Sequence, residues 1–204
     1  YWEGKTILSD LQKIITENNP DIIFNYMSSV YPDKIVNHYI NRDKLTGSFQ
    51  EDFQGLYQDG IYLGFAVTKI MKRELILKNH LLFIKGRHFE DIPWSFSLVK
   101  HIKNYAIYQN CFYMYRRERK GAISSVITAQ NQISLFQNLS NVITEITDMK
   151  LSNELELLPG LKKYADDIYR YVMTCYDLLS NKEKTMFYED IENINKEWVK
   201  INTL

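Results

Sequence analysis

The sequence predicts an α/β body followed by an all-helical region, and three observations support this fold class. Hydrophobic residues make up 45% of the 204-residue chain, which is enough for a sizeable core and unlike a disordered protein. Up to about residue 126, short apolar runs alternate with helical patterns, and beyond it every apolar pattern has helical spacing. We therefore expect an α/β part over residues 1–126 and a helical extension over residues 127–204.

The first part is expected to open with a helix over residues 6–17, where apolar side chains recur at helical spacing. The run DIIFNYMSSVY is apolar and bounded by turn residues, so it predicts a buried strand. KIVNHYI is a candidate second strand, and the polar residues 41–60 predict loop and a short helix. LGFAVTKIMKREL then predicts a strand that leads into a helix.

The next segment contains an acidic pair, Glu90 and Asp91. The run LLFIKGRHFED predicts a strand that ends at this pair, and residues 93–103 predict a short helix with Pro93 in its first turn. YAIYQNCFYMYRR is rich in Tyr, Phe and Ile and predicts one or two strands. The two acids are therefore expected between a strand and a helix.

Three helices are expected in the extension. Apolar residues at helical spacing mark the first over residues 133–146 and the second over residues 161–175, which Pro159 and Gly160 open. The third follows Ser180, because SNKE is a capping-box pattern.

Composition excludes several classes of protein. The 25 Lys and Arg residues balance the 25 Asp and Glu residues, so no global charge draws the chain to nucleic acid or to an anionic membrane. Cys111 and Cys175 are far apart and form neither a disulfide framework nor a zinc-binding spacing, which fits a reducing cytoplasm. No apolar run has the length of a transmembrane span. The 4 His residues show no ligand spacing, so we expect no metal ligands in this sequence.

The acidic pair has two interpretations. Asp91 lies just before an expected helix, where a carboxylate caps the N-terminus, and capping acids are common. Alternatively, a carboxylate at the end of a strand faces the usual ligand crevice of an α/β sheet. The apolar neighbours Phe89 and Trp94 would partly desolvate it there, as suits a general base. The residues alone leave both interpretations open.

A basic segment, YMYRRERKGAISS, follows the pair. It clusters Arg116, Arg117 and Arg119 ahead of Gly121 and Ser124. An Arg guanidinium binds two phosphate oxygens in a bidentate contact, and a Ser hydroxyl adds a hydrogen bond, so the segment is a candidate anion site. A solvated basic turn is the alternative. Nucleic acid is not favoured, because the patch is short and has no recognition motif beside it.

Three blocks, GFAVTKIMKREL, LFIKGRHFEDIPW and YMYRRERKGAIS, resemble in their order and spacing the C-terminal half of bacterial family-2 glycosyltransferases. These are GT-A enzymes that build capsular and lipopolysaccharide glycans. The resemblance covers residues 1–126, and the opening YWE matches the residues that come directly after the family's metal-binding Asp motif. It implies the C-terminal half of a GT-A (Rossmann-like) domain with a variable helical extension.

The resemblance also implies roles for single residues. Asp91 matches the family's general base, which deprotonates the acceptor hydroxyl, and Glu90 matches its partner acid. Arg116 or Arg117 matches the family's Arg near the diphosphate or acceptor, and Ser124 matches the Ser that comes after it.

Further positions are implied by the same resemblance. Lys69 and Arg73 match the basic positions of the first block, and Arg87 and His88 lie where the family often places a substrate-facing residue. The sequence departs from the family at Val67, where a Trp is usual, which puts the acceptor wall in doubt.

The implied reaction is an inverting transfer of a sugar from a nucleotide-diphospho-sugar to a hydroxyl of a glycan or lipid-linked acceptor. A divalent metal, Mn or Mg, would assist it, held by an Asp motif upstream of Tyr1. Because the donor-binding half is not in this sequence, the 204-residue chain alone is expected to be inactive. The expected location is the cytoplasm, at the inner face of the membrane.

Three questions stay open at this point. The chain opens with Tyr1 instead of Met, which fits a processed start or the C-terminal part of a longer protein. The apolar stripe from Leu161 to Tyr171 fits internal packing or a homodimer, with peripheral membrane association as the alternative. The rival to an enzyme is a non-catalytic protein-interaction domain or a truncated remnant, and the sequence upstream of Tyr1 would distinguish them.

Overall fold

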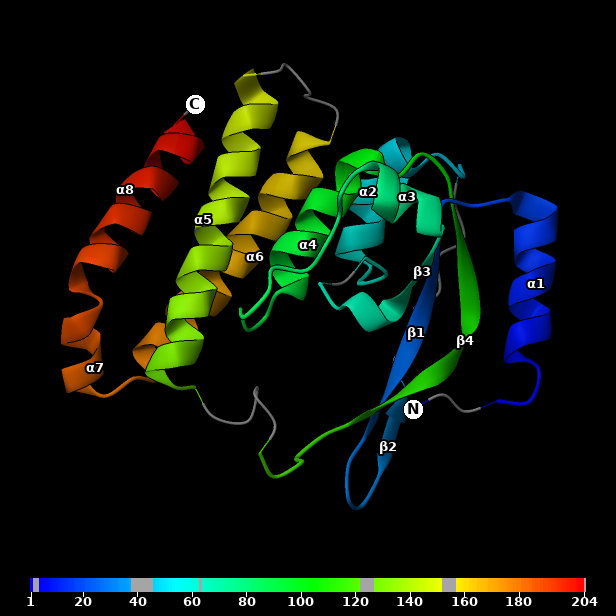
Figure 1. The fold of residues 1–204 in the computed structure, drawn as a ribbon, viewed down its shortest axis with the longest axis horizontal. Helices are drawn as coiled ribbons and strands as arrows, with labels where there is room; N and C mark the ends of the chain where they lie inside the picture. The colour runs from blue at the N-terminus through cyan, green and yellow to red at the C-terminus, as the bar shows by residue number, and fades with distance from the viewer. Residues whose placement is uncertain (2–3, 38–45, 63, 122–126, 152–156, 204) are drawn as a thin grey trace. The chain divides into compact units, whose positions relative to one another are not determined.

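The computed structural model describes residues 1, 4–37, 46–62, 64–121, 127–151 and 157–203, and Figure 1 shows their fold. These residues form two compact units. The α/β unit comprises Tyr1–Leu82 and Leu98–Lys120, and the helical unit comprises Phe83–Ser97 and Gly121–Leu204. The mixed α/β class and the helical C-terminal region that the sequence predicts are both confirmed.

The expected boundary at residue 126 lies at the edge of residues 122–126, which are outside the described part of the chain. A division at that residue stays a prediction. The segment Phe83–Ser97 contains the acidic pair. It packs in one unit with the helices of Gly121–Leu204, although Leu98–Lys120 lies between them in the sequence.

The sheet of the α/β unit is built on β1 (Ile22–Val30), whose first eight residues are buried. β4 (Tyr105–Arg116) runs parallel along one edge of β1. β3 (Lys69–Met71) and β2 (Ile35–Asn37) pair antiparallel with the beginning and the end of β1. Because β1 is a central strand covered on both faces, its sequence is nearly continuously apolar instead of alternating.

Helices and turns complete the α/β unit: α1 (Ile7–Asn18), α2 (Phe49–Gln58), α3 (Arg73–Lys78) and the 3₁₀ turns η1 (Ala66–Thr68) and η2 (Val99–His101). Helix α1 packs Ile7 and Leu11 against Ile23 of β1 and Tyr108 of β4. On the rest of the sheet, aromatic rings form the core.

Phe24 of β1 is the centre of this aromatic core. Its ring centroid lies 6.2 Å from that of Phe49, 5.6 Å from that of Tyr62 and 5.8 Å from that of Tyr105. Phe53 adds an edge-to-face contact with Tyr62 at 5.2 Å. Edge-to-face and tilted rings at these distances are favourable arrangements, so the packing of α2 against the sheet is well specified.

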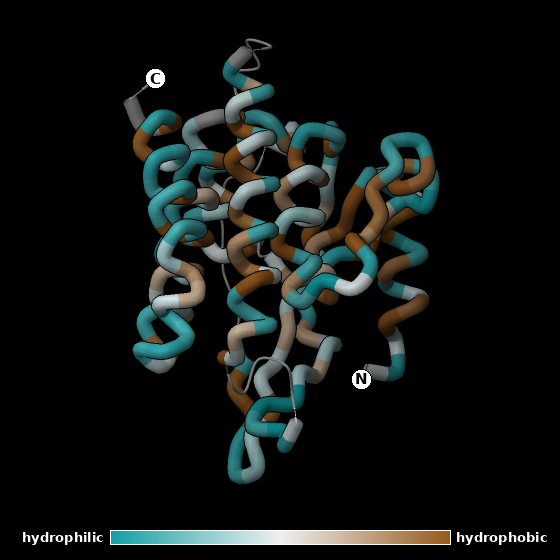
Figure 2. Tube along the Cα trace, turned by 60° about the vertical axis from the view of Figure 1, so that its left-hand side comes forward, coloured by the Kyte–Doolittle hydropathy of each residue, from teal (hydrophilic) through white to brown (hydrophobic). Residues whose placement is uncertain are grey.

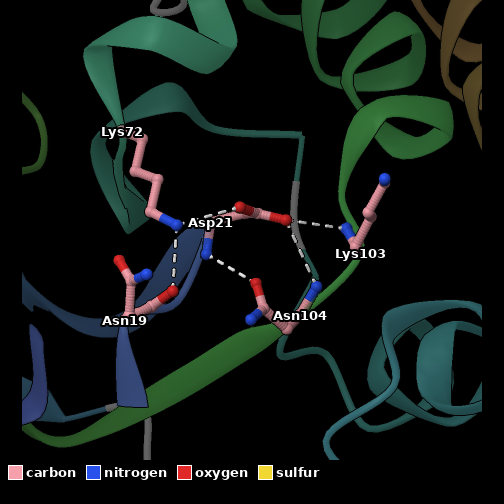
Figure 3. A network of polar contacts seen from close by, with 5 residues as sticks. All are labelled: Asn19, Asp21, Lys72, Lys103 and Asn104. Atoms are coloured by element: carbon pink, nitrogen blue, oxygen red, sulfur yellow. Dashed lines mark hydrogen bonds and ion pairs between the residues drawn. The ribbon is translucent and has the colours of Figure 1, made fainter. Parts of the chain in front are cut away.

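A polar network joins the amino-terminal ends of β1 and β4 (Figure 3). The Asp21 carboxylate accepts hydrogen bonds from the backbone N–H groups of Lys103 (3.0 Å) and Asn104 (3.4 Å), and its backbone N–H donates to Asn104 Oδ1 (2.9 Å). Lys72 Nζ contacts Asp21 (3.2 Å) and donates to the carbonyl oxygen of Asn19 (2.9 Å). These hydrogen bonds connect the amino-terminal ends of β1 and β4 and do not involve the carboxyl ends of the two strands.

The helical unit contains α4 (Asp91–Leu98), α5 (Ala129–Leu151), α6 (Leu158–Asp177), α7 (Asn181–Met186) and α8 (Tyr188–Thr203). Helices α6 and α8 both pack against α5, as Figure 1 shows. The tube in Figure 2 alternates between hydrophobic and hydrophilic colours along these helices, as expected of helices with one buried face.

Ring contacts tie the helical unit together. Phe96 of α4 lies 5.7 Å from Tyr164 of α6, and Phe136 of α5 lies 5.6 Å from Phe187. Helix α7 opens with the predicted capping box, in which Ser180 and Glu183 exchange hydrogen bonds. The third predicted helix is thus confirmed at its start, but it is interrupted at Phe187, whose side chain is buried.

One expected strand is wrong. Residues 81–90 form loop and turns, and the acidic pair therefore follows a loop instead of a strand. The backbone turns sharply at Gly86 (φ 77°) and Phe89 (φ 56°), which is incompatible with an extended strand. YAIYQNCFYMYRR forms a single strand, β4, up to Arg116, and residues 38–40 of the second candidate strand lie outside the described residues.

Candidate functional site

The predicted site residues fall into two groups. Lys69, Arg116 and Arg117 belong to the α/β unit, whereas Arg87, His88, Glu90 and Asp91 belong to the helical unit. Ser124 lies outside the described residues. The structure therefore presents a basic group and an acidic group, each within its own unit.

Two members of the basic group, Arg116 and Arg117, line a pocket of about 410 Å³ at the carboxyl ends of β1 and β4 together with Arg119. The register pairs Val30, the last residue of β1, with Arg116, the last residue of β4. In α/β sheets, ligands bind beyond the carboxyl ends of parallel strands, so the pocket lies where a ligand is expected. Its lining residues are Tyr1, Val30, Tyr31, Pro32, Arg116, Arg117 and Arg119.

Arg117 is the most firmly held of the three arginines. Its Nε donates to Ser29 Oγ (3.1 Å), its guanidinium carbon lies 4.6 Å from the centre of the Tyr115 ring, and its backbone N–H donates to the carbonyl oxygen of Val30 (2.8 Å). Since the guanidinium has five N–H donors and only Nε bonds to Ser29, donors remain for an anion.

The other two arginines are more exposed. The Arg116 guanidinium lies 5.4 Å from the centre of the Tyr1 ring, and Arg119 follows Glu118, whose φ is 54°. Three guanidinium groups around one pocket, next to aromatic rings, can bind an anion with several oxygens, such as a diphosphate.

Lys69 is placed differently. It is 7% exposed, its ammonium group donates to the carbonyl oxygen of Phe65 (2.9 Å), and it lies 4.9 Å from the centre of the Tyr62 ring. These contacts connect η1 and β3 to the aromatic core. In this structure the Lys69 charge supports the fold of the α/β unit.

The acidic group stands at the start of α4. Asp91 is the first residue of this helix, and both Glu90 and Asp91 are partly buried. The backbone N–H of Trp94 donates to the carbonyl oxygen of Glu90 (3.4 Å), which closes the first turn. The positive end of the helix dipole favours a carboxylate here. The capping and catalytic interpretations are therefore compatible.

A buried tyrosine reports the charge of Asp91. The pKa of Tyr164 is raised by burial and, to a lesser extent, by the negative charge of Asp91, while a hydrogen bond with Ser95 acts in the opposite direction. Tyr164 comes from α6, so the acidic pair is packed against the helical core. The Asp91 carboxylate thus lies in an environment that is part protein and part solvent.

Arg87 and His88 both contact helix α5. Arg87 Nη1 donates to Asn138 Oδ1 (3.4 Å), and His88 Nδ1 lies 2.9 Å from Asn131 Oδ1. Because an amide oxygen only accepts, His88 Nδ1 is the donor in this contact. Sequence reasoning missed Asn131 and Asn138. The available signal was the helical spacing of Asn131, Ser134 and Asn138 in a helix that is rich in polar residues.

Neither group provides a metal site. Among the described residues, no three His, Cys, Asp or Glu side chains converge closely enough to hold a metal ion. The divalent metal that the family resemblance implies, with its ligands upstream of Tyr1, stays a prediction. Within the same part of the chain, no helix is both long enough and apolar enough to cross a membrane.

Comparison with solved structures finds S. aureus TarS, a glycosyltransferase. TarS in complex with UDP matches at a TM-score of 0.54 and 11% identity, covering 94% of this chain and 52% of that chain. TarS in complex with UDP-GlcNAc gives a TM-score of 0.47 and 13% identity, covering 97% of this chain and 63% of that chain.

These likenesses concern the fold. The chain spans 52% to 63% of the length of these TarS chains. No protein family and no curated protein matches the sequence. At such low identity the structural likeness does not extend to a substrate, and the chain has a glycosyltransferase-like fold.

Proposed function

We propose that the protein is a glycosyltransferase of the GT-A, family-2 type. It moves a sugar from a nucleotide-diphospho-sugar to a hydroxyl of a glycan or lipid-linked acceptor in the synthesis of capsule or lipopolysaccharide. The observation that carries this proposal is the three-arginine pocket at the carboxyl ends of β1 and β4 within a glycosyltransferase-like fold. The UDP in the TarS structure with a TM-score of 0.54 makes uridine nucleotides the first donors to test.

The proposed step is a single displacement. The acceptor oxygen attacks the anomeric carbon, the bond from that carbon to the diphosphate oxygen breaks, and its electron pair leaves with the diphosphate. The proton of the acceptor hydroxyl passes to the Asp91 carboxylate. One base and no enzyme nucleophile suffice, so the configuration at the anomeric carbon inverts.

The arginines act on the donor, whose diphosphate is the leaving group. Arg117, with Arg116 and Arg119, binds the diphosphate and stabilises its negative charge as it leaves. Glu90 supports Asp91 or binds the acceptor, and His88 and Arg87 face the substrate. We also propose the divalent metal, Mn or Mg, that the family resemblance implies; it would stabilise the leaving diphosphate, and none of the described residues is assigned as its ligand.

The location and partners are inferred from this reaction. We place the protein in the cytoplasm at the inner face of the membrane, where such donors and lipid-linked acceptors meet. We also propose a homodimer contact through the helical unit, where Leu178 (72%) and Val199 (60%) are exposed. We further propose that a chain limited to these 204 residues is inactive, so the kinetic measurements below are made on the polypeptide of the native source and its variants.

The experiment uses the polypeptide purified from its native source. It is incubated with UDP-GlcNAc and a panel of other nucleotide sugars, with a lipid extract of the same cells as acceptor. Release of nucleoside diphosphate together with incorporation of labelled sugar supports the proposal. Absence of both with every donor would sink it and would favour the protein-interaction domain.

A further inference from the structure

Helix α5 carries a stripe of buried polar side chains to which the proposed reaction gives no role. Asn131, Ser134 and Asn138 are 4%, 2% and 0% exposed. Their spacing along the chain puts them on one face of the helix. Burying a polar group costs free energy unless hydrogen bonds within the protein replace its hydrogen bonds with water. Apolar side chains at these positions would be buried without that cost. A stripe of this kind therefore indicates a specific set of partners.

Each of the three side chains contacts the short segment that precedes the acidic pair. Asn131 Oδ1 lies 2.9 Å from His88 Nδ1, and Ser134 Oγ accepts from the backbone N–H of His88 (3.2 Å). Asn138 Nδ2 donates to the carbonyl oxygens of both His88 (3.0 Å) and Phe89 (2.9 Å). One amide group thus bridges two successive carbonyls, which fixes the orientation of both peptide planes.

The bridged residue has an unusual backbone. Phe89 has a φ of 56°, in the left-handed region that side chains other than Gly, Asn and Asp rarely adopt. Such conformations persist where the surroundings determine them, and they cluster at functional sites. The Asn138 bridge and the ring contact between Phe89 and Tyr171 (6.3 Å) are the interactions that hold it.

The turn at Phe89 determines how α4 begins. The backbone N–H of Ile92 donates to the carbonyl oxygen of Phe89 (3.1 Å), so the peptide that Asn138 orients is also the first support of the helix. Glu90 and Asp91 are the two residues between these positions. The directions in which the Glu90 and Asp91 side chains point from the backbone are therefore set by the same hydrogen bonds.

We propose that Asn138, with Ser134 and Asn131, is a positioning residue that fixes the Glu90–Asp91 pair for proton transfer. This inference rests on the proposed function and deepens it. A general base must be held within hydrogen-bond reach of its proton, and small displacements lower the rate steeply. Helix α5 is therefore a working part of the catalytic apparatus and not an accessory extension.

The test compares two buried amides in the same helix. Asn138→Leu removes the bridge to the acidic segment. Gln132→Leu is the matched control, because Gln132 is also 0% exposed but its Nε2 donates to the carbonyl oxygen of Val172 in α6 (3.3 Å). Both variants lose one buried amide from α5. Only the first loses its connection to the acidic pair.

Two readouts are measured on each variant. We expect Asn138→Leu to accelerate hydrogen exchange at the amides of Ile92 and Trp94 and to lower kcat by about 10–100-fold, with the KM for the donor unchanged. Gln132→Leu should change neither, even where the two variants lose similar thermal stability. Equal kcat in both variants, or a loss of kcat that tracks stability alone, would overturn the proposal.

Rescue gives a second criterion. Asn adopts the left-handed conformation readily, so adding Phe89→Asn to Asn138→Leu should restore much of the lost kcat. A double variant no faster than Asn138→Leu contradicts the proposed route through Phe89. If Asn138→Leu does not fold, Ser134→Ala replaces it, with a smaller loss of kcat of about 3–10-fold expected.

The exchange measurement also separates this inference from the proposed function. Where the wild-type protein transfers no sugar but Asn138→Leu still loosens Ile92 and Trp94, the glycosyltransferase proposal fails and the positioning of the segment stands as a structural fact without its catalytic meaning. Where transfer is observed and exchange at these amides is unchanged in Asn138→Leu, the positioning role fails alone.

Discussion

The acidic pair and the arginine pocket are held in opposite ways. The segment before Glu90 and Asp91 is bonded to fully buried side chains of α5 through its backbone, so its geometry is over-determined. The arginines stand at the open end of two strands, where Arg117 is held by Ser29 and the Tyr115 ring and Arg116 has a ring contact with Tyr1. A base must meet its proton at one distance, whereas charge attraction to an anion tolerates some freedom.

This contrast predicts different kinetic consequences for the two groups. Changes in the acidic group should lower turnover without affecting donor binding. Changes in the arginine pocket should weaken donor binding and increase its sensitivity to salt. Five changes test the contrast and the fold that supports it, beginning with the largest expected effect.

The largest effect is expected from Asp91→Asn, which keeps the shape of the side chain but cannot accept the proton. We expect kcat to fall by about 10²–10⁴-fold, since that is the usual contribution of a general base. The measurement is steady-state transfer with saturating donor. Turnover close to that of the wild type would remove Asp91 from the catalytic role.

The next largest effect concerns the fold of the α/β unit. Asp52 is 4% exposed, and its carboxylate accepts hydrogen bonds from Tyr105 Oη (2.7 Å), the backbone N–H of Thr46 (2.8 Å) and the backbone N–H of Gly47 (3.2 Å). Asp52→Ala leaves these donors without an acceptor, so we expect a loss of about 2–4 kcal/mol in the free energy of unfolding. Urea denaturation monitored by circular dichroism measures it.

Asp52 also makes stability depend on pH. Burial raises the pKa of its carboxyl, but the hydrogen bonds from Tyr105, Thr46 and Gly47 outweigh burial, so the pKa is lowered from its ordinary value of 3.8. A carboxyl with a lowered pKa in the folded state stabilises the protein fully above the unfolded value, and this contribution is lost as the pH falls through the folded value. The loss should therefore occur below pH 3.8 in the wild type and be absent from Asp52→Asn.

A smaller effect is expected in the arginine pocket from Arg117→Lys. Lys keeps the charge but loses the paired donors and the planar contact with the Tyr115 ring. We expect the KM for the donor to rise by about 10-fold with little change in kcat. Lys13→Ala is the control, because Lys13 is an exposed residue whose ion pair is with Glu17. A fall in kcat with unchanged KM would contradict a role in donor binding.

The smallest effect is expected at the helix cap of α7. Ser180→Ala removes the side chain that accepts from the backbone N–H of Glu183, so we expect a loss of about 1 kcal/mol in the free energy of unfolding. Transfer kinetics should be unchanged, because the cap lies outside both site groups. Thermal unfolding and the transfer assay together check this, and a large loss of activity would show that the groups are not independent of α7.

The features that the sequence predicts correctly depend on local pattern. The Ser180 capping box and the buried strand DIIFNYMSSVY are each determined by residues within a few positions of one another. The loop before the acidic pair could not be predicted in this way. Leu82 and Phe83 give it a strand-like composition, yet they are 70% and 48% exposed, and its hydrogen bonds come from α5, more than 40 residues later.

In the candidate site, too, some features follow from local sequence patterns and others depend on contacts between distant segments. The cluster of arginines is visible in the sequence, and so is the acidic pair. The pocket itself depends on the parallel pairing of β1 with β4, which brings Val30 beside Arg116 and which no local pattern encodes. The polar stripe of α5 was missed because the apolar spacing marks only the hydrophobic part of the buried surface, whereas Gln132, Ser134 and Asn138 are buried as well and Ile133 is 37% exposed.

The most direct test of the account is calorimetric titration of UDP into the wild type, Arg117→Ala and Asp91→Asn. The account predicts that UDP binds the wild type and Asp91→Asn with similar affinity and that Arg117→Ala binds about 10–100-fold more weakly, since a paired charge contact is lost. Equal binding to the wild type and Arg117→Ala would contradict the assignment of the pocket, and a loss of binding in Asp91→Asn would contradict the division of labour between the two groups.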